Sequence, residues 1–178
     1  MSERQQGTRE PHAPTAREKL DELAATGMYV FHGSPDPHIE EFEPRQAHNY
    51  DASTDTNVPD GAPAVFASDR VDIPIFMALF NRTHSANSAS VLSGTGVRSD
   101  GEVRKGEFRA TKNLIDGVRK PGVYGIVYVF DRSQFLPREP GSSEWICNTV
   151  IHPTMALTVY ISDFPEKVTE ITVDGKTV

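Results

Sequence analysis

Cysteine is nearly absent from this sequence, because Cys147 is the only one among its 178 residues. A single thiol cannot form a disulfide within the chain, and it cannot supply the thiolate cluster of a Cys-based zinc site. Cys147 lies within a run that predicts a β-strand, so we expect its thiol to be buried and unreactive. We also expect no metal ion, because four of the histidines have spacings that match no metal site: His32, His48, His84 and His152.

Long apolar runs are also missing. The first nineteen residues, MSERQQGTREPHAPTAREK, are polar and lack the apolar stretch of a signal peptide. No later run approaches the length that a membrane-spanning helix needs. These absences predict a cytoplasmic protein without a membrane partner.

The sequence has no excess of positive charge, since 25 acidic residues outnumber 18 basic ones and the net charge is −7. A protein that grips nucleic acid broadly needs a basic face, so this balance disfavours nucleic acid as a partner without excluding it. A small basic pocket for a phosphorylated ligand is still possible, although such charges also simply keep a surface soluble. The basic residues that could supply such a pocket are Arg45, Arg70, Arg98, Arg104, Lys105 and Arg109.

What the sequence does contain suits one compact domain. Hydrophobic residues make up 37% of the chain, and a chain of this length can bury roughly 70% of its unfolded surface. Residues 1–14 are polar, include two prolines and a glycine, and have no hydrophobic periodicity. They predict a disordered N-terminal tail, which leaves residues 15–178 for the domain.

The first predicted elements are a helix and a strand. Thr15 and Glu18 have the spacing of a capping box, and Gly27 is placed as a C-terminal stop, so a helix should lie between them. The aromatic and apolar run 28–31 (MYVF) then predicts a strand that ends at His32.

A second strand, residues 63–68 (PAVFAS), runs directly into a second helix. Pro74 is tolerated only in the first turn of a helix, so this helix should begin close to Asp72. Ser68 or Asp69 would then be its N-cap.

Three more strands are predicted, and two long segments lie between the regular elements. The strands cover residues 122–131, 144–151 and 155–164. Segments 35–62 and 84–121 are polar or rich in glycine, which indicates hairpins or loops that face a substrate or form a lid. At least five strands, two helices and no regular βαβ alternation predict an α+β fold.

His32, Phe66 and Glu144 stand out because each lies where a predicted strand meets a turn or a helix. Side chains at strand ends can converge on one cleft. Gly33 has no Cβ and would let a flat amide approach the backbone, while the ring of Phe66 could stack on a flat ligand. His32 could donate a hydrogen bond to a ligand hydroxyl, and Ser34 could add a second polar contact.

The segments that carry these residues, YVFHGS, AVFASDRVDIPIFMALF and SSEW, resemble the ADP-ribosyltransferase superfamily. The similar branch includes diphtheria toxin and the poly-ADP-ribose polymerases, and it carries a histidine, a tyrosine and a glutamate on separate strands. Here Phe66 stands at the position of the tyrosine. The resemblance covers about residues 28–165. It implies a single domain with a split, curved antiparallel β core and a few flanking helices, which uses nicotinamide adenine dinucleotide (NAD) as a substrate and needs no metal.

The resemblance also implies roles for individual residues. Glu144 and His32 match the catalytic pair, and His32 would hydrogen-bond a ribose hydroxyl of NAD. The backbone of Gly33 would hold the nicotinamide carboxamide, and Phe66 would stack on the nicotinamide ring, since stacking needs only the ring. The predicted NAD-binding set is completed by Ser34, Arg45, Ser68 and Phe76, with Met77 as an alternative to Phe76.

The residue types suit this chemistry. Breaking the bond between nicotinamide and ribose builds positive charge on the sugar, as in glycoside hydrolysis. A carboxylate beside the ribose can stabilise that charge, and it can also act as a general base for the acceptor.

Simpler explanations exist for each residue. His32 could be an ordinary histidine of the core or of a turn, Phe66 could be a core residue, and Glu144 could be a surface carboxylate. Glu139 and Glu107 also lie near turns and compete with Glu144 for the catalytic role.

Three functions are therefore compared. The first is an enzyme that transfers ADP-ribose from NAD to an unknown acceptor, for example as a toxin, or that hydrolyses NAD. The second is a module that binds NAD or ADP-ribose without turnover. The third is an enzyme of the tRNA 2′-phosphotransferase type, which the acidic net charge disfavours.

Overall fold

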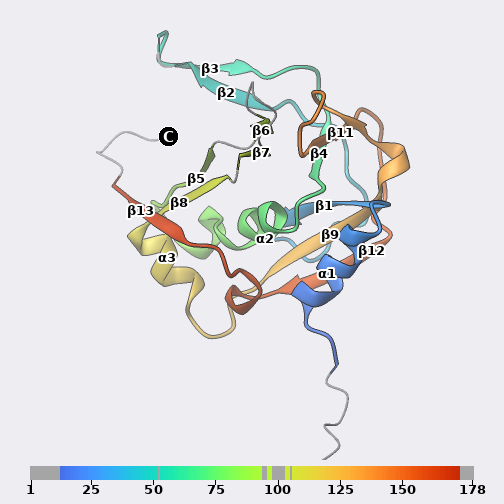
Figure 1. Cartoon of the computed structure of the whole chain (residues 1–178). Coiled ribbons are helices and arrows are strands. Elements are labelled where there is room, and N and C mark those ends of the chain that lie inside the picture. Colours follow the sequence, from blue (N-terminus) through green and yellow to red (C-terminus); the bar gives the residue numbers. More distant parts are fainter. Residues whose placement is uncertain (1–12, 52, 94–95, 98–102, 105, 173–178) are drawn as a thin grey trace, which may run out of the picture.

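The computed structural model in Figure 1 describes residues 13–51, 53–93, 96–97, 103–104 and 106–172. The tail predicted over residues 1–14 lies outside this range except for its last two positions. The first helix, α1 (Ala16–Ala25), has the predicted capping box, since the Thr15 hydroxyl accepts from the Glu18 N–H and the Glu18 carboxylate accepts from the Thr15 N–H. Gly27 follows with a φ of +67°, a conformation that favours glycine.

Six strands form the main sheet, in the order β10–β11–β4–β1–β9–β12, and all neighbouring pairs are antiparallel. Alternate residues of the central strand β9 contribute to the cores on opposite faces of the sheet, Val127 and Val129 to one and Ile126, Tyr128 and Phe130 to the other. The strands are β1 (Tyr29–Ser34), β4 (Val65–Ser68), β9 (Gly125–Asp131), β10 (Leu136–Pro137), β11 (Glu144–Cys147) and β12 (Met155–Val159). The sheet curves around one end of the molecule (Figure 1).

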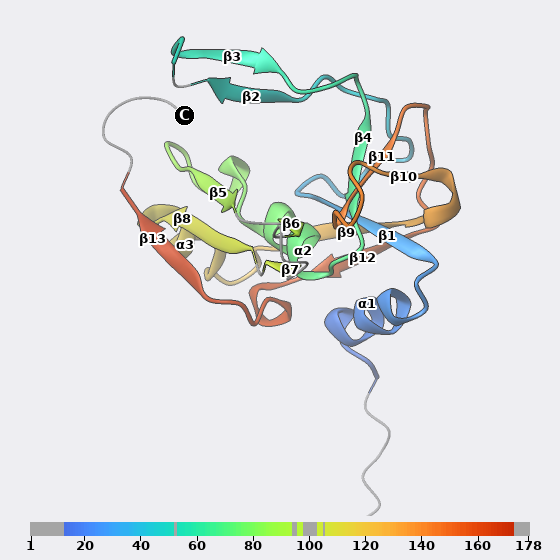
Figure 2. The same ribbon diagram turned by 45° about the horizontal axis from the view of Figure 1, so that its top comes forward.

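A smaller sheet has the order β13–β8–β5, with β13 parallel to β8 and β5 antiparallel to it. The hairpin of β2 and β3 extends away from both sheets, as Figure 2 shows. No helix among the described residues is both long and apolar enough to cross a membrane. The remaining elements are β2 (His48–Asp51), β3 (Thr56–Pro59), η1 (Arg82–His84), β5 (Ser90–Ser93), β6 (Gly96–Val97), β7 (Val103–Arg104), β8 (Glu107–Thr111), α3 (Lys112–Val118), η2 (Arg132–Gln134), η3 (Ile161–Asp163) and β13 (Val168–Ile171).

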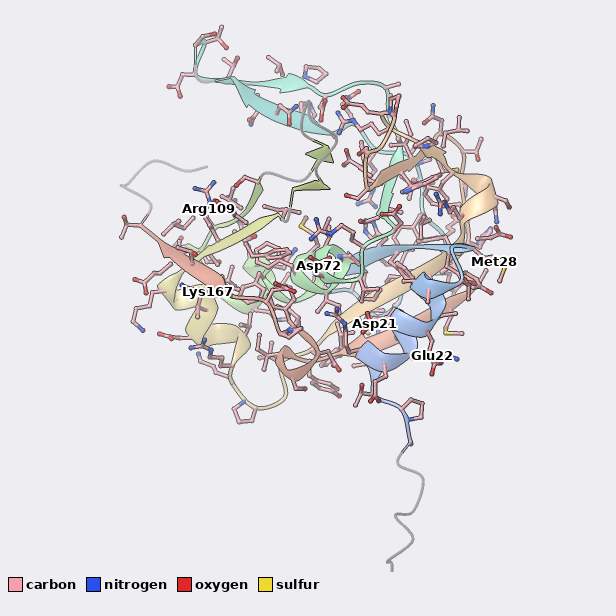
Figure 3. All side chains as sticks on the ribbon, viewed as in Figure 1. Asp21, Glu22, Met28, Asp72, Arg109 and Lys167 are labelled. Carbon is pink, nitrogen blue, oxygen red and sulfur yellow. The ribbon has the colours of Figure 1, made fainter. Side chains whose placement is uncertain are left out.

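Helix α2 (Asp72–Leu79) lies between the two sheets and joins their cores. Its sequence, DIPIFMAL, is apolar apart from Asp72, which is typical of a largely buried helix, and six of its eight residues are buried. Phe76 packs against Phe108 of the smaller sheet, with 4.9 Å between the ring centroids. Asp72 begins the helix near the middle of the molecule (Figure 3), where its buried carboxylate pairs with Arg70.

Two glycines let α2 lie directly on the main sheet. A Cβ on Gly33 of β1 would stand 1.8 Å from the carbonyl oxygen of Pro74, and one on Gly125 of β9 would stand 2.6 Å from the Cβ of Ala78. No side chain fits at either position unless the helix moves. Helix packing therefore accounts for Gly33, whereas the sequence had suggested that the missing Cβ makes room for a ligand.

The predicted end of β1 and the predicted N-cap of α2 are both wrong. Strand β1 does not end at His32 but continues to Ser34, because β9 pairs with it over its whole length as far as Ser34 opposite Ile126. Helix α2 begins at Asp72 as expected, but its N-cap is Val71, which makes no side-chain capping bond, rather than Ser68 or Asp69.

The segment 84–121 contains more regular structure than the sequence predicted. It includes helix α3 and the strands β5 and β8, which carry part of the molecular core through Phe108, Ala110 and Leu114. The predicted strands at 122–131, 144–151 and 155–164 are present as β9, β11 and β12, each shorter than the predicted run. The fold is α+β, with three α-helices in the described part of the chain.

Candidate functional site

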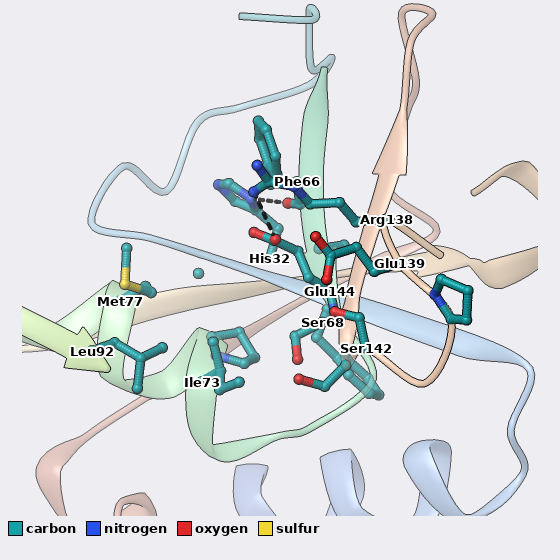
Figure 4. Close-up of a pocket in the computed structure, with 16 residues that line it drawn as sticks. His32, Phe66, Ser68, Ile73, Met77, Leu92, Arg138, Glu139, Ser142 and Glu144 are labelled. Atoms are coloured by element: carbon teal, nitrogen blue, oxygen red, sulfur yellow. Dashed lines mark hydrogen bonds and ion pairs between the residues drawn. The ribbon is translucent and has the colours of Figure 1, made fainter. Parts of the chain in front are cut away.

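A cavity of about 450 Å³ opens where β1, β4 and β11 lie side by side (Figure 4). Its volume lies in the range of small-molecule sites. We call it the large cavity. One side is apolar and the other polar, as Figure 4 shows. The apolar side comes from α2 and β5 (Ile73, Pro74, Met77 and Leu92), and the polar side from β11 and the turn before it (Arg138, Glu139, Ser142, Ser143 and Glu144).

Five of the eight predicted site residues line the large cavity: His32, Gly33, Phe66, Ser68 and Glu144. They come from neighbouring strands of the main sheet, because β4 pairs with β1 on one side and with β11 on the other. Ser68 lies opposite Glu144 in one pairing and is also the residue of β4 that pairs with β1. Met77 lines the same cavity. The three segments that the sequence singled out thus meet at one place.

His32 is held by the neighbouring strand. Its Nδ1 lies 2.7 Å from the carbonyl oxygen of Phe66, and because a carbonyl can only accept, Nδ1 must carry the hydrogen. Burial lowers the pKa of His32 more than this hydrogen bond raises it, and Arg45 lowers it further. The imidazole is therefore neutral at pH 7, with its lone pair on Nε2. A ligand hydroxyl would donate to Nε2, which reverses the direction that the sequence analysis assumed.

The backbone of Gly33 faces a gap between two strands. The pairing of β1 with β4 includes only Phe31 and Ser68 in these fully described strands. The N–H of Asp69 donates to the carbonyl oxygen of Ser143 on the β11 side, so the backbone groups of Ser68 point the other way, toward β1. Phe31 and Gly33, two residues apart, direct their N–H and C=O groups to that same edge. At Gly33 this edge has no partner from β4 and borders the large cavity.

Glu144 is held by Arg138 across a hairpin. The backbone N–H of Arg138 donates to the carbonyl oxygen of Glu144 at 2.9 Å, and Nη1 of its side chain donates to the Glu144 carboxylate at 2.8 Å. The same guanidinium pairs with Asp60, and its central carbon lies 5.6 Å from the centroid of the Phe66 ring. Hydrogen bonds to Asp60 and Glu144 raise the pKa of Arg138 above its usual range, so its charge is permanent.

The rival carboxylates have different positions. Glu139 lines the large cavity on the same side as Glu144 (Figure 4). Glu107 begins β8 in the smaller sheet and does not contribute to the cavity wall. Of the two, only Glu139 competes with Glu144 on geometry.

A second cavity of about 370 Å³ adjoins the large one, because His32 and Phe66 line both. Two further predicted residues, Ser34 and Arg45, lie in its wall. The Ser34 hydroxyl accepts a hydrogen bond from the N–H of Asp36 at 3.1 Å. Arg45 is fixed through its backbone, which pairs with Ala64 at 3.1 Å in both directions, while the residue itself is exposed.

Phe76, the eighth predicted residue, lies in the hydrophobic core and lines neither cavity. Its ring is fully buried and stacks on Phe80 at a centroid distance of 4.7 Å. It supports the cavity wall from behind, while the neighbouring Met77 supplies the lining.

Arg138 and Asp60 were not among the site residues predicted from the sequence. A signal for Arg138 was available, because a Pro140-Gly141 turn between two strands brings residues on either side of it face to face. Asp60 gave no such signal, since it comes from a polar segment between β3 and β4 whose course depends on tertiary contacts.

The described residues contain no group of three or more histidine, cysteine, aspartate or glutamate side chains that could hold a metal ion. Comparison of the chain with models of known protein families, with curated proteins and with solved structures gave no match.

Proposed function

We propose that this protein is an NAD-dependent ADP-ribosyltransferase that cleaves the bond between nicotinamide and ribose. The observation that carries the proposal is the large cavity, where His32, the edge of Gly33 that has no partner from β4, Phe66 and Glu144 meet. These are the residues that resemble the superfamily in sequence. The curved six-stranded sheet, with α2 packed on it and a smaller sheet beyond, is consistent with the split β core of that superfamily.

Each residue has a role that its environment supports. The N–H and C=O of Gly33 would pair with the nicotinamide carboxamide, in place of a strand partner. The ring of Phe66 would stack on the pyridine ring. Neutral His32 would accept a hydrogen bond from a ribose hydroxyl at Nε2.

In the proposed reaction, the electron pair of the glycosidic bond goes to the nicotinamide nitrogen, which loses its positive charge. The ribose carbon becomes cationic and then bonds to the nucleophile of the acceptor or to water, whose proton passes to the carboxylate of Glu144 or to solvent. The carboxylate of Glu144 would stabilise that cation, and one preorganised charge of this kind is typically worth about 10²–10³ in rate.

The second cavity would take the adenosine and diphosphate half of NAD, with Arg45 near the phosphates and Ser34 in its wall. Arg45 and Arg138 are the only lysine or arginine residues among the described lining of the two cavities, against five carboxylates: Asp36, Glu41, Glu43, Glu139 and Glu144. A dinucleotide with two phosphates needs little positive charge. An RNA substrate needs much more, which disfavours the tRNA 2′-phosphotransferase alternative.

The second candidate is an NAD-binding module without turnover. It is favoured by one observation, the ion pair that engages the Glu144 carboxylate with Arg138 in this structure. A carboxylate committed to an arginine has less charge to offer a ribose cation.

Nicotinamide release decides between the two. Purified protein is incubated with NAD, free nicotinamide is quantified by chromatography, and binding of NAD is measured by calorimetry. We expect the wild type to release nicotinamide, and Glu144→Gln to lower kcat about 100- to 1,000-fold while still binding NAD. Glu139→Gln is the matched control, because it removes the other carboxylate on the same wall. The kcat of Glu139→Gln should stay within a few-fold of the wild-type value.

Each other result has a clear meaning. Binding without nicotinamide release supports the non-catalytic module. If kcat falls in Glu139→Gln and not in Glu144→Gln, the catalytic carboxylate is that of Glu139. If NAD neither binds nor reacts, the proposed function is wrong.

A further inference from the structure

Arg138 faces Glu144 because of the hairpin that carries both residues. The register of β10 and β11 pairs Leu136 with Ile146 and Pro137 with Trp145, so the next position pairs Arg138 with Glu144. The backbone hydrogen bond from Arg138 to Glu144 continues this register. Residues directly opposite in an antiparallel pair direct their side chains to the same face. The contact between guanidinium and carboxylate is thus built into the strand pairing.

The guanidinium has further anchors outside the hairpin. It pairs with Asp60, whose backbone N–H is fixed to the carbonyl oxygen of Ala47 at 2.8 Å. It also lies over the ring of Phe66 on β4, a contact between a cation and an aromatic face. Arg138 is therefore held from the β3–β4 connection, from β4 and from β11 at once.

Glu144 is less constrained than its partner. The Glu144 side chain is 42% exposed, against 28% for Arg138 and 20% for Asp60. An exposed glutamate on a strand end can adopt several rotamers, and here the hydrogen bond from Nη1 of Arg138 selects the one that lies in the cavity wall. The backbone N–H of Glu144 donates to the Ser142 hydroxyl, but this fixes only the main chain.

The charges of the three groups sum to −1, because Asp60 and Glu144 share one guanidinium. A net negative cluster complements the cationic ribose of the proposed reaction. With Arg138 and Glu144 alone the sum would be zero, so Asp60 offsets the cost of pairing the catalytic carboxylate with an arginine.

We propose that Arg138 is a positioning residue, which aims the Glu144 carboxylate at the ribose and is itself held in place by Asp60. This inference rests on the proposed function, since it assigns a task to Arg138 within that reaction. Arg138 need not touch the reacting atoms, so its removal should affect catalysis more than binding.

The test compares variants by kcat for nicotinamide release and by the dissociation constant of NAD from calorimetry. Arg138→Gln should lower kcat roughly 100-fold, because a misplaced catalytic group can cost a factor of that size. Its dissociation constant should stay within about threefold of the wild type. Arg138→Lys keeps the charge but has one ammonium group for two carboxylates, so it should recover roughly a tenth of the wild-type kcat. The kcat of Asp60→Asn should lie between that of Arg138→Lys and that of the wild type.

Arg132→Gln is the matched control. Arg132 also stacks on an aromatic ring, that of Trp145 at 3.9 Å, but it lies outside both cavities. This variant should keep the wild-type kcat. Thermal melting of each variant shows whether it is folded, and Arg138→Lys and Asp60→Asn carry the test if Arg138→Gln does not fold.

Three results would overturn the inference alone while nicotinamide release by the wild type stands. They are a kcat for Arg138→Gln within threefold of the wild type, a lysine variant no better than the glutamine variant, and a loss confined to NAD binding. A wild type that releases no nicotinamide overturns the proposed function, and with it this role for Arg138.

Discussion

Replacing Gly33 with alanine should destabilise the fold sharply. The new Cβ would stand 1.8 Å from the carbonyl oxygen of Pro74, 2.7 Å from its carbonyl carbon and 2.9 Å from the backbone nitrogen of Ala78. All three are main-chain atoms of α2, so no side-chain rotation relieves the overlap and the helix has to move. Overpacking of a core typically costs about 1–3 kcal/mol, and we expect the upper end, about 3 kcal/mol. For a chain of this length, that lowers Tm by roughly 6–12 °C.

Thermal and urea unfolding of two further variants separate this steric effect from the effect of backbone conformation. Gly61 has a φ of +73°, and among the described residues, its two chain neighbours aside, none has an atom within 4 Å of the place that its Cβ would take, so Gly61→Ala should cost only the roughly 1–2 kcal/mol of a left-handed conformation. The loss of stability in Gly125→Ala should be closer to that in Gly33→Ala, because its Cβ would stand 2.6–2.8 Å from atoms of Ala78. A Tm for Gly33→Ala within about 2 °C of the wild type would refute the direct packing of α2 on β1.

Two more predictions concern His32 and Phe66. Burial lowers the pKa of folded His32 below the 6.5 of an exposed histidine, so the unfolded chain takes up this proton first and the free energy of unfolding should fall as the pH drops below about 6.5. Urea unfolding at several pH values should show that the free energy of unfolding falls less steeply with acid for His32→Gln than for the wild type, and an unchanged slope would contradict a half-buried neutral imidazole. Phe66→Tyr should bind NAD within about threefold of the wild type, whereas Phe66→Leu should bind roughly 3- to 10-fold more weakly, because ring stacking is worth about 0.5–1.5 kcal/mol. Calorimetry measures both, and equal affinities would argue against stacking.

The elements that the sequence predicted well are those with strong local signals. Helix α1 has a capping box at one end and a glycine with positive φ at the other, and both act within a few residues. Strand β9 follows from a run of β-branched and aromatic residues, all but its last residue being buried. In both cases the residues themselves determine the structure.

The errors arose where distant contacts decide the structure. His32 and Gly33 are poor strand residues, yet they belong to β1 because β9 supplies a partner for each of them. Helix α3 has only seven residues, contains Gly117 and has no side-chain cap, so its local propensity is low and its packing on β8 and β13 stabilises it. The β2–β3 hairpin lacks the buried alternation of a strand, since all residues of β3 are exposed.

The candidate site divides in the same way. His32, Phe66 and Glu144 were singled out because each stands at a recognisable junction in the sequence. Arg138 and Asp60 depend on strand register and on the path of a polar connection, neither of which composition or periodicity reveals. The residues proposed to touch the ligand thus have stronger local signals than the residues proposed to orient them.

His32 also explains why the sheet opens at this place. In the antiparallel register that pairs Phe31 with Ser68, the next residues to bond would be Gly33 and Phe66. The carbonyl oxygen of Phe66 instead accepts from Nδ1 of His32, so this part-buried acceptor is satisfied without the N–H of Gly33. The histidine thus takes the hydrogen bond that would have closed the two strands, and the backbone of Gly33 is left facing the large cavity. A side chain without a donor at position 32 would leave the Phe66 carbonyl to pair with Gly33, which would close the edge that the proposed carboxamide contact needs.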